Sequence, residues 1–414
     1  MNSDTSLFPL IASRVTESRY LHPGFQFCGD PDNGLLQVPE DLLNYLLSLL
    51  KDDPILPPKV PHRQWTELLS VLNPHWILPL LYWQIGSFPS EFHPPAAVME
   101  HIKHLFLCTR VQTFHLEEQL REVLAAFDKE GVRVLLLKGP ALARTVYPDT
   151  ALRQGSDIDL LVLPELMTHS RAILEGLGYI NQEKRFEVSR DFYCEEKFMP
   201  GQELKNKRMI ELHWDLHRFS GIKRDAGVAN LFHNAVKIVS PPLTFEALHP
   251  IDALIHRSLN NAFIHDRDVR LSWIYDVVLL ARSLAVPDDW DILQKRSMEW
   301  RARLAVEHAL NLAQIWCGLQ LPRAYKDFST WPRPSKIETD AWRNATRRHE
   351  RVSDYFKLHL SDASGLSEKI RFFIHLLFPS QEYMKAKYPP SEEGLLFLSY
   401  IRRWGHWFRK ILNR

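Results

Sequence analysis

The stretch from Val132 to Val162, VRVLLLKGPALARTVYPDTALRQGSDIDLLV, restricts the fold more than any other part of the chain. It predicts a buried strand over 132–137, a turn at Lys138-Gly139 leading into a short helix, and a second strand over 157–163. On both sides of it, apolar residues recur at helical spacing instead. We therefore expect an α+β fold, in which strands and helices form one core within a mostly helical chain.

Four regions are predicted along the chain. A long helix over 96–130 ends at Gly131, where the apolar period changes, and Pro241-Pro242 marks the end of the strand-rich part. The expected regions are an irregular N-terminal arm (1–36), a helical N-terminal region (37–130), the core (131–240) and a helical C-terminal domain (241–414).

Composition excludes several classes of protein. The 414 residues carry a net charge of only +1, so nucleic acid is not an expected partner. The four cysteines form no CxxC pair, which argues against a zinc site and a disulfide scaffold and favours a reducing compartment. No secretory signal and no uncharged apolar run of membrane-spanning length is present. We expect a soluble, cytoplasmic protein without a transmembrane segment.

Asp157 and Asp159 are the first candidate site residues. Side chains two positions apart in a strand project from the same face, and hard divalent cations such as Mg²⁺ or Mn²⁺ prefer carboxylate oxygens. The alternative is a strand entered from a polar loop with two solvated aspartates, and for an isolated pair that alternative is the commoner one. The turn at Lys138-Gly139 and the neighbouring Ser156 favour the metal site.

The turn after the first strand predicts a phosphate site. Gly139 lets the backbone approach a phosphate closely at a helix N-terminus, and Lys138, Arg153 and Ser156 are candidate donors to phosphate oxygens. The alternative is an ordinary glycine turn with an exposed lysine. The segment is not a Walker A loop, because GxxxxGK[ST] is absent.

The segment 209–217, MIELHWDLH, alternates strictly between polar and apolar residues. As a strand it places Glu211, His213, Asp215 and His217 on one face, where Glu211 is a candidate third carboxylate. Glu211 with His213 would also suit zinc, but two carboxylates from a separate strand favour magnesium or manganese. The alternative is an amphipathic surface strand.

The helices after residue 250 offer weaker candidates. The His265-Asp266 pair, with His256, is reminiscent of HD-type phosphohydrolases, but such a pair is common by chance. The basic, aromatic C-terminal helix is expected to dock on the protein through Leu398, Ile401, Trp404 and Trp407, with a membrane surface or an acidic peptide as alternatives. Possible acceptor or nucleotide contacts are His213, Asp215, Asn260 and His265; further lining candidates are Arg257, Asn261, Arg270 and Asp276.

Several motifs together resemble a known family. KGPAL, Tyr147-Pro148-Asp149, the run from Ser156 to Val162, and ELHW are similar to the uncharacterised nucleotidyltransferase family of the DNA polymerase β-like superfamily. The likeness extends to LPLLY in the N-terminal half and to LFPSQEYMKAKYP near the C-terminus. Members of this family are found with lasso-peptide and other peptide natural-product clusters.

The resemblance implies a polymerase β-like nucleotidyltransferase core and an NTP, such as ATP, as substrate. Asp157, Asp159 and Glu211 take the positions of the catalytic metal-binding carboxylates, and Gly139 that of the glycine before the nucleotide-binding helix. The implied reaction is Mg-dependent transfer of NMP to a hydroxyl or phosphate acceptor, a peptide natural product or small metabolite. The alternatives are a toxin-like enzyme that modifies protein or RNA, and a catalytically silent peptide-binding module. The chain departs from the superfamily in having Gly139-Pro140 where Gly-Ser or Gly-Gly is usual.

Overall fold

The structure is a computed structural model of the 414-residue chain. It describes residues 26–27, 34–182, 194–204, 206–216, 227–263, 268–284, 286–346 and 396–412, together with 370, 374, 377–378 and 384. Most of the arm predicted over 1–36 lies outside this part, as do His217, His265 and Asp266.

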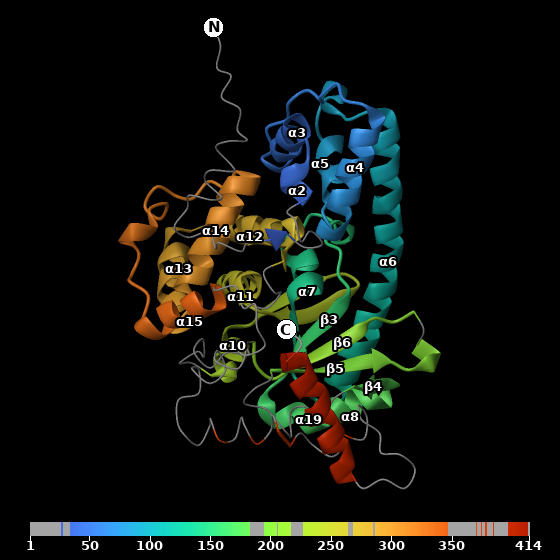
Figure 1. The fold of residues 1–414 in the computed structure, drawn as a ribbon, viewed down its shortest axis with the longest axis vertical. Helices are drawn as coiled ribbons and strands as arrows, with labels where there is room; N and C mark the ends of the chain where they lie inside the picture. Colours follow the sequence, from blue (N-terminus) through green and yellow to red (C-terminus); the bar gives the residue numbers. More distant parts are fainter. Residues whose placement is uncertain are drawn as a thin grey trace.

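A mixed seven-stranded sheet lies at the centre, in the order β4-β5-β6-β3-β2-β8-β7 (Figure 1). Together with the surrounding helices it confirms the α+β class. Its strands are β2 (Leu135–Leu137), β3 (Asp157–Leu161), β4 (Tyr179–Asn181), β5 (Glu195–Pro200), β6 (Met209–His213), β7 (Val236–Ser240) and β8 (Leu243–Ala247). A separate parallel pair joins β1 (Gln26–Phe27) to β9 (Asp268–Val269).

The two central strands with the predicted acidic residues run parallel and in register. β3 pairs with β6 so that Asp157 lies opposite Met209 and Asp159 opposite Glu211. On its other side β3 pairs antiparallel with β2, which sets Leu137 opposite Asp159. The first strand is shorter than predicted and begins at Leu135.

The sheet continues past residue 240, where we placed the end of the core. β7 and β8 form an antiparallel hairpin around Pro241-Pro242, and β8 pairs parallel with β2. These prolines lie in a turn of the sheet, because proline cannot donate to a strand ladder but fits a turn. The division of the chain into domains stays a prediction.

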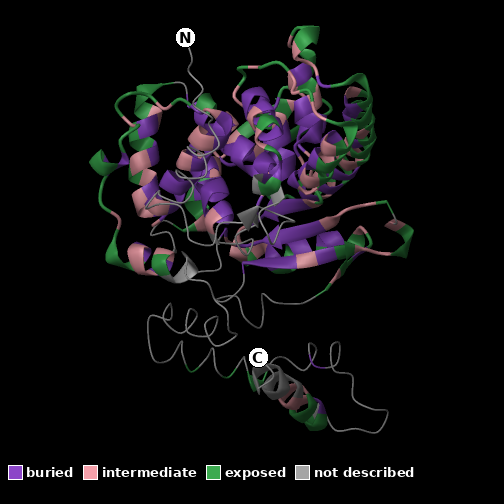
Figure 2. Cartoon of the chain, turned by 45° about the horizontal axis from the view of Figure 1, so that its top comes forward, coloured by how far each residue is buried: buried purple, intermediate pink, exposed green. Residues whose placement is uncertain are grey.

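The two faces of the sheet are covered differently. Ile158, Leu160 and Ile210 face a cluster that includes side chains of α6 (Ala96–Lys129) and α8 (Met167–Gly176). The opposite face carries the acidic residues and packs toward α7 (Lys138–Thr145) and the C-terminal helices. Figure 2 shows the buried residues concentrated in the sheet and in the helices beside it.

The remaining helices precede and follow the strands of the sheet in the sequence. α6 ends at Lys129, and Gly131 follows with φ +68°, the left-handed conformation expected of a helix-terminating glycine. The other helices are α2 (Gly34–Gln37), α3 (Glu40–Leu50), α4 (His62–Leu72), α5 (Leu78–Gly86), α10 (Val228–Asn234), α11 (Pro250–Phe263), α12 (Leu271–Ser283), α13 (Pro287–Glu299), α14 (Arg303–Cys317), α15 (Lys336–Thr346) and α19 (Leu396–Leu412).

A buried ion pair ties the segment before β3 to α12. Arg153 donates two hydrogen bonds to Asp276, Nε to Oδ1 at 2.7 Å and Nη2 to Oδ2 at 2.8 Å. The Tyr147 hydroxyl donates to the same carboxylate at 2.8 Å. Removing one partner from such a pair costs roughly 3–5 kcal/mol, so this contact fixes the C-terminal helices against the core.

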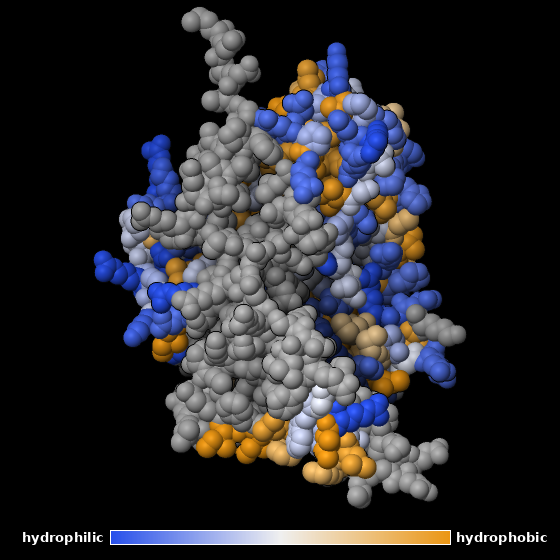
Figure 3. Space-filling model, viewed as in Figure 1, coloured by the Kyte–Doolittle hydropathy of each residue, from blue (hydrophilic) through white to orange (hydrophobic). Residues whose placement is uncertain are grey.

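The C-terminal helix differs from its predicted packing. Leu398 and Ile401 on α19 are exposed rather than docked, and Phe397 beside them is exposed too. Trp404 does make a contact, donating a hydrogen bond from Nε1 to the Leu377 carbonyl oxygen, while the side chain of Trp407 is outside the described part. Figure 3 shows apolar side chains gathered at this end of the molecule. Among the described helices, none combines the length and apolar character needed to cross a membrane.

Candidate active site

The predicted acidic residues meet on one face of β3 and β6. Asp159 and Glu211 are buried neighbours across the parallel pair, and Asp157 lies two residues before Asp159 on the same strand. The alternation of strand side chains explains this placement: Ile158 and Leu160 enter the apolar core, so the aspartates project the other way. Asp157 and Asp159 therefore lie on the same face of β3, as their two-residue spacing predicts.

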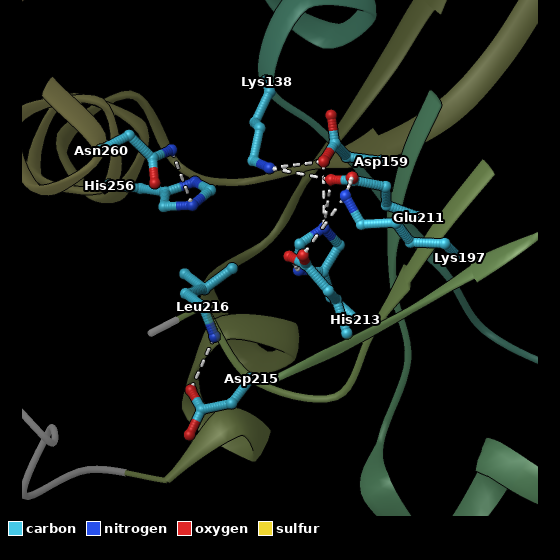
Figure 4. A network of polar contacts seen from close by, with 10 residues as sticks. Lys138, Asp159, Lys197, Glu211, His213, Asp215, Leu216, His256 and Asn260 are labelled. Carbon is cyan, nitrogen blue, oxygen red and sulfur yellow. Dashed lines mark hydrogen bonds and ion pairs between the residues drawn. The ribbon is translucent and has the colours of Figure 1, made fainter. Parts of the chain in front are cut away.

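Lys138 reaches into this group from the junction of β2 and α7 (Figure 4). Its Nζ lies 2.5 Å from Asp159 Oδ1 and 3.6 Å from Glu211 Oε2. Its φ is +51°, a left-handed conformation that costs a non-glycine residue about 1–2 kcal/mol. Burial alone would lower the pKa of Lys138, but the charges of Asp159, Glu211 and Glu195 outweigh it and raise the pKa. Lys138 is therefore a charged ammonium among carboxylates.

His213 completes the group from the end of β6. Its Nε2 lies 2.9 Å from Asp159 Oδ1, and its Nδ1 lies 3.6 Å from Glu195 Oε2 on β5. Lys197, also on β5, places Nζ 2.8 Å from Glu211 Oε1. Glu195 and Lys197 were missed by sequence reasoning. Their alternation in CEEKFMP is a strand signal, but it does not reveal which strand they pair with.

The electrostatics show a surplus of negative charge near Asp157. Burial, followed by the charges of Asp159 and Glu211, raises the pKa of Asp157 to about 6. Burial would also raise the pKa of Glu211, but Lys138, His213 and Lys197 lower it well below its usual range. Glu211 is therefore held ionised, whereas for Asp157 the attraction of Lys138 does not outweigh burial and the neighbouring carboxylates.

These side chains fit a divalent cation. Asp159, Glu211 and His213 each offer one ligand atom, and the three atoms lie within 4.8 Å of one another. Carboxylate oxygens are the donors that Mg²⁺ and Mn²⁺ prefer, and two positive groups, Lys138 and His213, already converge on one oxygen of Asp159. A second group in the described part, Cys194, Glu195 and His213, has donors of the kind that zinc accepts.

The predicted phosphate-site residues differ in burial and in whether they are already paired. Gly139 follows Lys138 in the first turn of α7, and the nearest atoms to a Cβ at this position would be those of the Arg153 side chain, at 3.7 Å. Ser156 is exposed next to Asp157. Arg153 is buried and committed to Asp276, so a phosphate contact would require that ion pair to break. Arg153 therefore stays outside the nucleotide site that we propose below.

The predicted acceptor contacts are also separated by the structure. β6 ends at His213, so Asp215 is not on the polar face of the strand; its Oδ1 accepts a hydrogen bond from the Leu216 backbone N–H. Asn260 is buried on α11 with its Nδ2 3.2 Å from His256 Nε2, and Figure 4 shows both facing Lys138. His265 lies outside the described residues.

We predict that His213 is a protonated imidazolium at neutral pH when no metal ion is bound. Burial and Lys138 would lower the pKa of His213, but its hydrogen bonds to Asp159 and Cys194 and the charge of Glu195 raise it to about 10. Its stabilising contribution is thus complete below the unfolded pKa of about 6.5 and is lost as the pH rises through about 10. Asp159→Asn should lower the titration midpoint.

Histidine-selective ¹⁵N NMR measures this midpoint directly. The His213→Gln variant identifies the signal by its disappearance, and exposed His62 provides an internal reference in the same spectra. A His213 signal that titrates near pH 6.5 in the wild-type protein would contradict the geometry described here.

Comparison with known proteins identifies the family of the chain. The structure of the antibiotic-resistance factor ANT(2'')-Ia shows 16% identity and a TM-score of 0.34, with 48% of this chain and 98% of that chain covered. No curated protein matches the chain. The model of the family described as "Uncharacterised nucleotidyltransferase" matches residues 61–318, more than half of the sequence. This match includes every strand from β2 to β8, and the chain belongs to that family of nucleotidyltransferases.

Proposed function

We propose that this protein transfers a nucleoside monophosphate from an NTP to an acceptor in a reaction that depends on Mg²⁺ or Mn²⁺. The observation that carries the proposal is the register of β3 and β6, which sets Asp159 opposite Glu211 with Asp157 on the same face. Membership of a nucleotidyltransferase family supplies the class of reaction. In that reaction an acceptor oxygen attacks the α-phosphate, the bond to the β-phosphate breaks, and pyrophosphate and a proton are released.

Asp157, Asp159 and Glu211 are the residues that would hold the cation. When bound, the cation would neutralise the triphosphate and polarise the α-phosphate. The lowered pKa of Glu211 keeps this ligand ionised, and the raised pKa of Asp157, caused by burial and by the charges of Asp159 and Glu211, would fall when a cation binds between them. Lys138, already charged among the carboxylates, is the donor best placed to contact phosphate oxygens. Positioning and charge neutralisation would account for most of the rate.

For the acceptor, we propose a hydroxyl or phosphate group of a peptide or small metabolite. This part of the proposal rests on the sequence resemblance, including its link to lasso-peptide clusters. A toxin-like enzyme that modifies a protein or RNA is the competing enzyme function, and labelled proteins in a lysate would favour it.

One observation favours a catalytically silent binding module instead. Lys138, Lys197 and His213 already supply three cationic groups to the carboxylates, so much of the negative charge is balanced without a metal. A silent module would bind its ligand equally well with and without Mg²⁺. Calorimetry with each NTP, in the presence of Mg²⁺ or EDTA, separates the two functions.

We predict that Asp157→Asn, Asp159→Asn and Glu211→Gln each lower transfer at least roughly 100-fold, because each removes a carboxylate that would hold the charge-neutralising cation. The assay incubates each α-³²P-labelled NTP with Mg²⁺ and candidate acceptors encoded by neighbouring genes. Glu246→Gln is the matched control: it makes the same change on β8, where the carboxylate instead pairs with Arg133 near the surface.

Circular dichroism checks that these variants keep the fold. Turnover near the wild-type rate in either aspartate variant would exclude the proposed cation site. Loss of turnover in Glu246→Gln to the same extent would mean that the carboxylate changes act through the fold.

We predict that Gly139→Ala weakens NTP binding by about tenfold or more without lowering stability. The protein leaves room for the added methyl, whose nearest neighbour is the Arg153 side chain at 3.7 Å, whereas a phosphate at the helix N-terminus would meet it. NTP affinity and melting temperature are measured on the same samples. Gly155→Ala is the control, since a Cβ there meets nothing within 4 Å. Unchanged NTP affinity in Gly139→Ala would show that the triphosphate does not bind at the N-terminus of α7.

A further inference from the structure

A small pocket lies between α7 and α11, next to the carboxylates. Lys138 lines it from α7, and His256, Arg257 and Asn260 line it from α11. These three positions share one face of α11, because residues three and four apart are neighbours on a helix. Leu137 and Leu248 contribute an apolar floor.

Two buried polar atoms of the lining residues have no hydrogen-bond partner. They are Nη2 of Arg257 and Oδ1 of Asn260, on residues that are only 5% and 1% exposed. Arg257 Nε donates to Asn261 and its guanidinium lies over the Trp273 ring, so the side chain is fixed in place while Nη2 is left over. A buried donor without a partner destabilises the fold, and a ligand with acceptor oxygens would supply the missing hydrogen bond.

The pocket wall also carries unbalanced positive charge. Arg257 Nη1 lies 3.7 Å from Asp276 Oδ2, but Arg153 already holds that carboxylate through two hydrogen bonds. Tyr147 also donates a hydrogen bond to Asp276, and burial raises the pKa of its hydroxyl, so Tyr147 stays neutral. Two guanidinium groups therefore share one carboxylate. Burial, with repulsion from Arg153, lowers the pKa of Arg257 to about 10 despite attraction to Asp276, as expected of a cation with incomplete compensation.

We infer that this pocket is a phosphate-binding subsite with Arg257 as its principal donor. A phosphate oxygen would accept from Nη2 of Arg257, and Lys138 at the pocket edge would bridge the phosphate to the carboxylates. Half a rotation of the Asn260 amide would offer an N–H to the same group and let Oδ1 accept from His256.

Given the proposed function, the phosphate belongs either to the NTP or to a phosphorylated acceptor. Both present the same oxygens to Arg257, so binding of a simple polyphosphate tests the subsite itself. Comparison of NTP affinity then identifies the source of the phosphate.

The first experiment titrates inorganic tripolyphosphate into the full-length protein in a Mg²⁺ buffer by calorimetry. Arg257→Gln and Asn260→Asp should each weaken binding by about tenfold or more, the second because it places a negative charge in the pocket at almost constant shape. Arg208→Gln is the matched control. Arg208 lines a different hollow on the opposite side of α7, near Asp157, and should leave the affinity within about twofold.

Melting temperatures identify a variant that has lost its fold, and Asn260→Asp keeps the test valid if Arg257→Gln is unstable. Absence of wild-type binding would overturn the proposal. So would wild-type affinity in Asn260→Asp, or a loss of binding confined to Arg208→Gln.

The second experiment repeats the titration with each NTP. A parallel loss of NTP affinity in the pocket variants assigns the subsite to the triphosphate. Unchanged NTP affinity with reduced tripolyphosphate binding assigns it to a phosphorylated acceptor. Neither readout requires turnover, so failure of the proposed transfer reaction would not alter this result.

Discussion

The parallel pairing of β3 with β6 is the constraint on which the rest of the site depends. It sets Asp159 beside Glu211 in a buried position, where two carboxylates repel each other strongly. Lys138 and His213 offset that repulsion, and the backbone of Lys138 adopts a left-handed conformation where β2 meets α7. A parallel pair needs a long connection, and here the chain between β3 and β6 contains α8, β4 and β5. The same connection brings Lys197 to Glu211.

The sequence was sufficient for those parts of the fold and site that local periodicity determines. Residues two positions apart in a strand project from the same face. The sequence therefore predicts that Asp157 shares a face with Asp159, and Glu211 with His213. Helical spacing likewise predicted α6, and the glycine after it marked its end. Each of these features depends on residues close together in the chain, so it can be predicted without knowing which distant residues pack against them. The resemblance to a nucleotidyltransferase family added the class of reaction, which the family match supports.

Features set by distant partners were not predictable in the same way. Arg153 seemed suited to phosphate because it precedes the acidic strand, but its partner is Asp276, 123 residues later. Pro241-Pro242 was interpreted as the end of the core because proline interrupts strands, yet β8 follows it and joins β2. Leu398 and Ile401 have the spacing of a docked helix face, but no described residue covers them. In each case the outcome depends on a partner far away in the chain, which the local pattern does not identify.

Anomalous scattering from a crystal grown with Mn²⁺ and a non-hydrolysable NTP analogue shows whether the face shared by β3 and β6 binds a divalent cation. We expect an anomalous peak bounded by Asp157, Asp159 and Glu211, with the ammonium of Lys138 moved away from Asp159 and toward the triphosphate. A bound nucleotide without a peak at these carboxylates, and with Lys138 still on Asp159, would contradict this expectation.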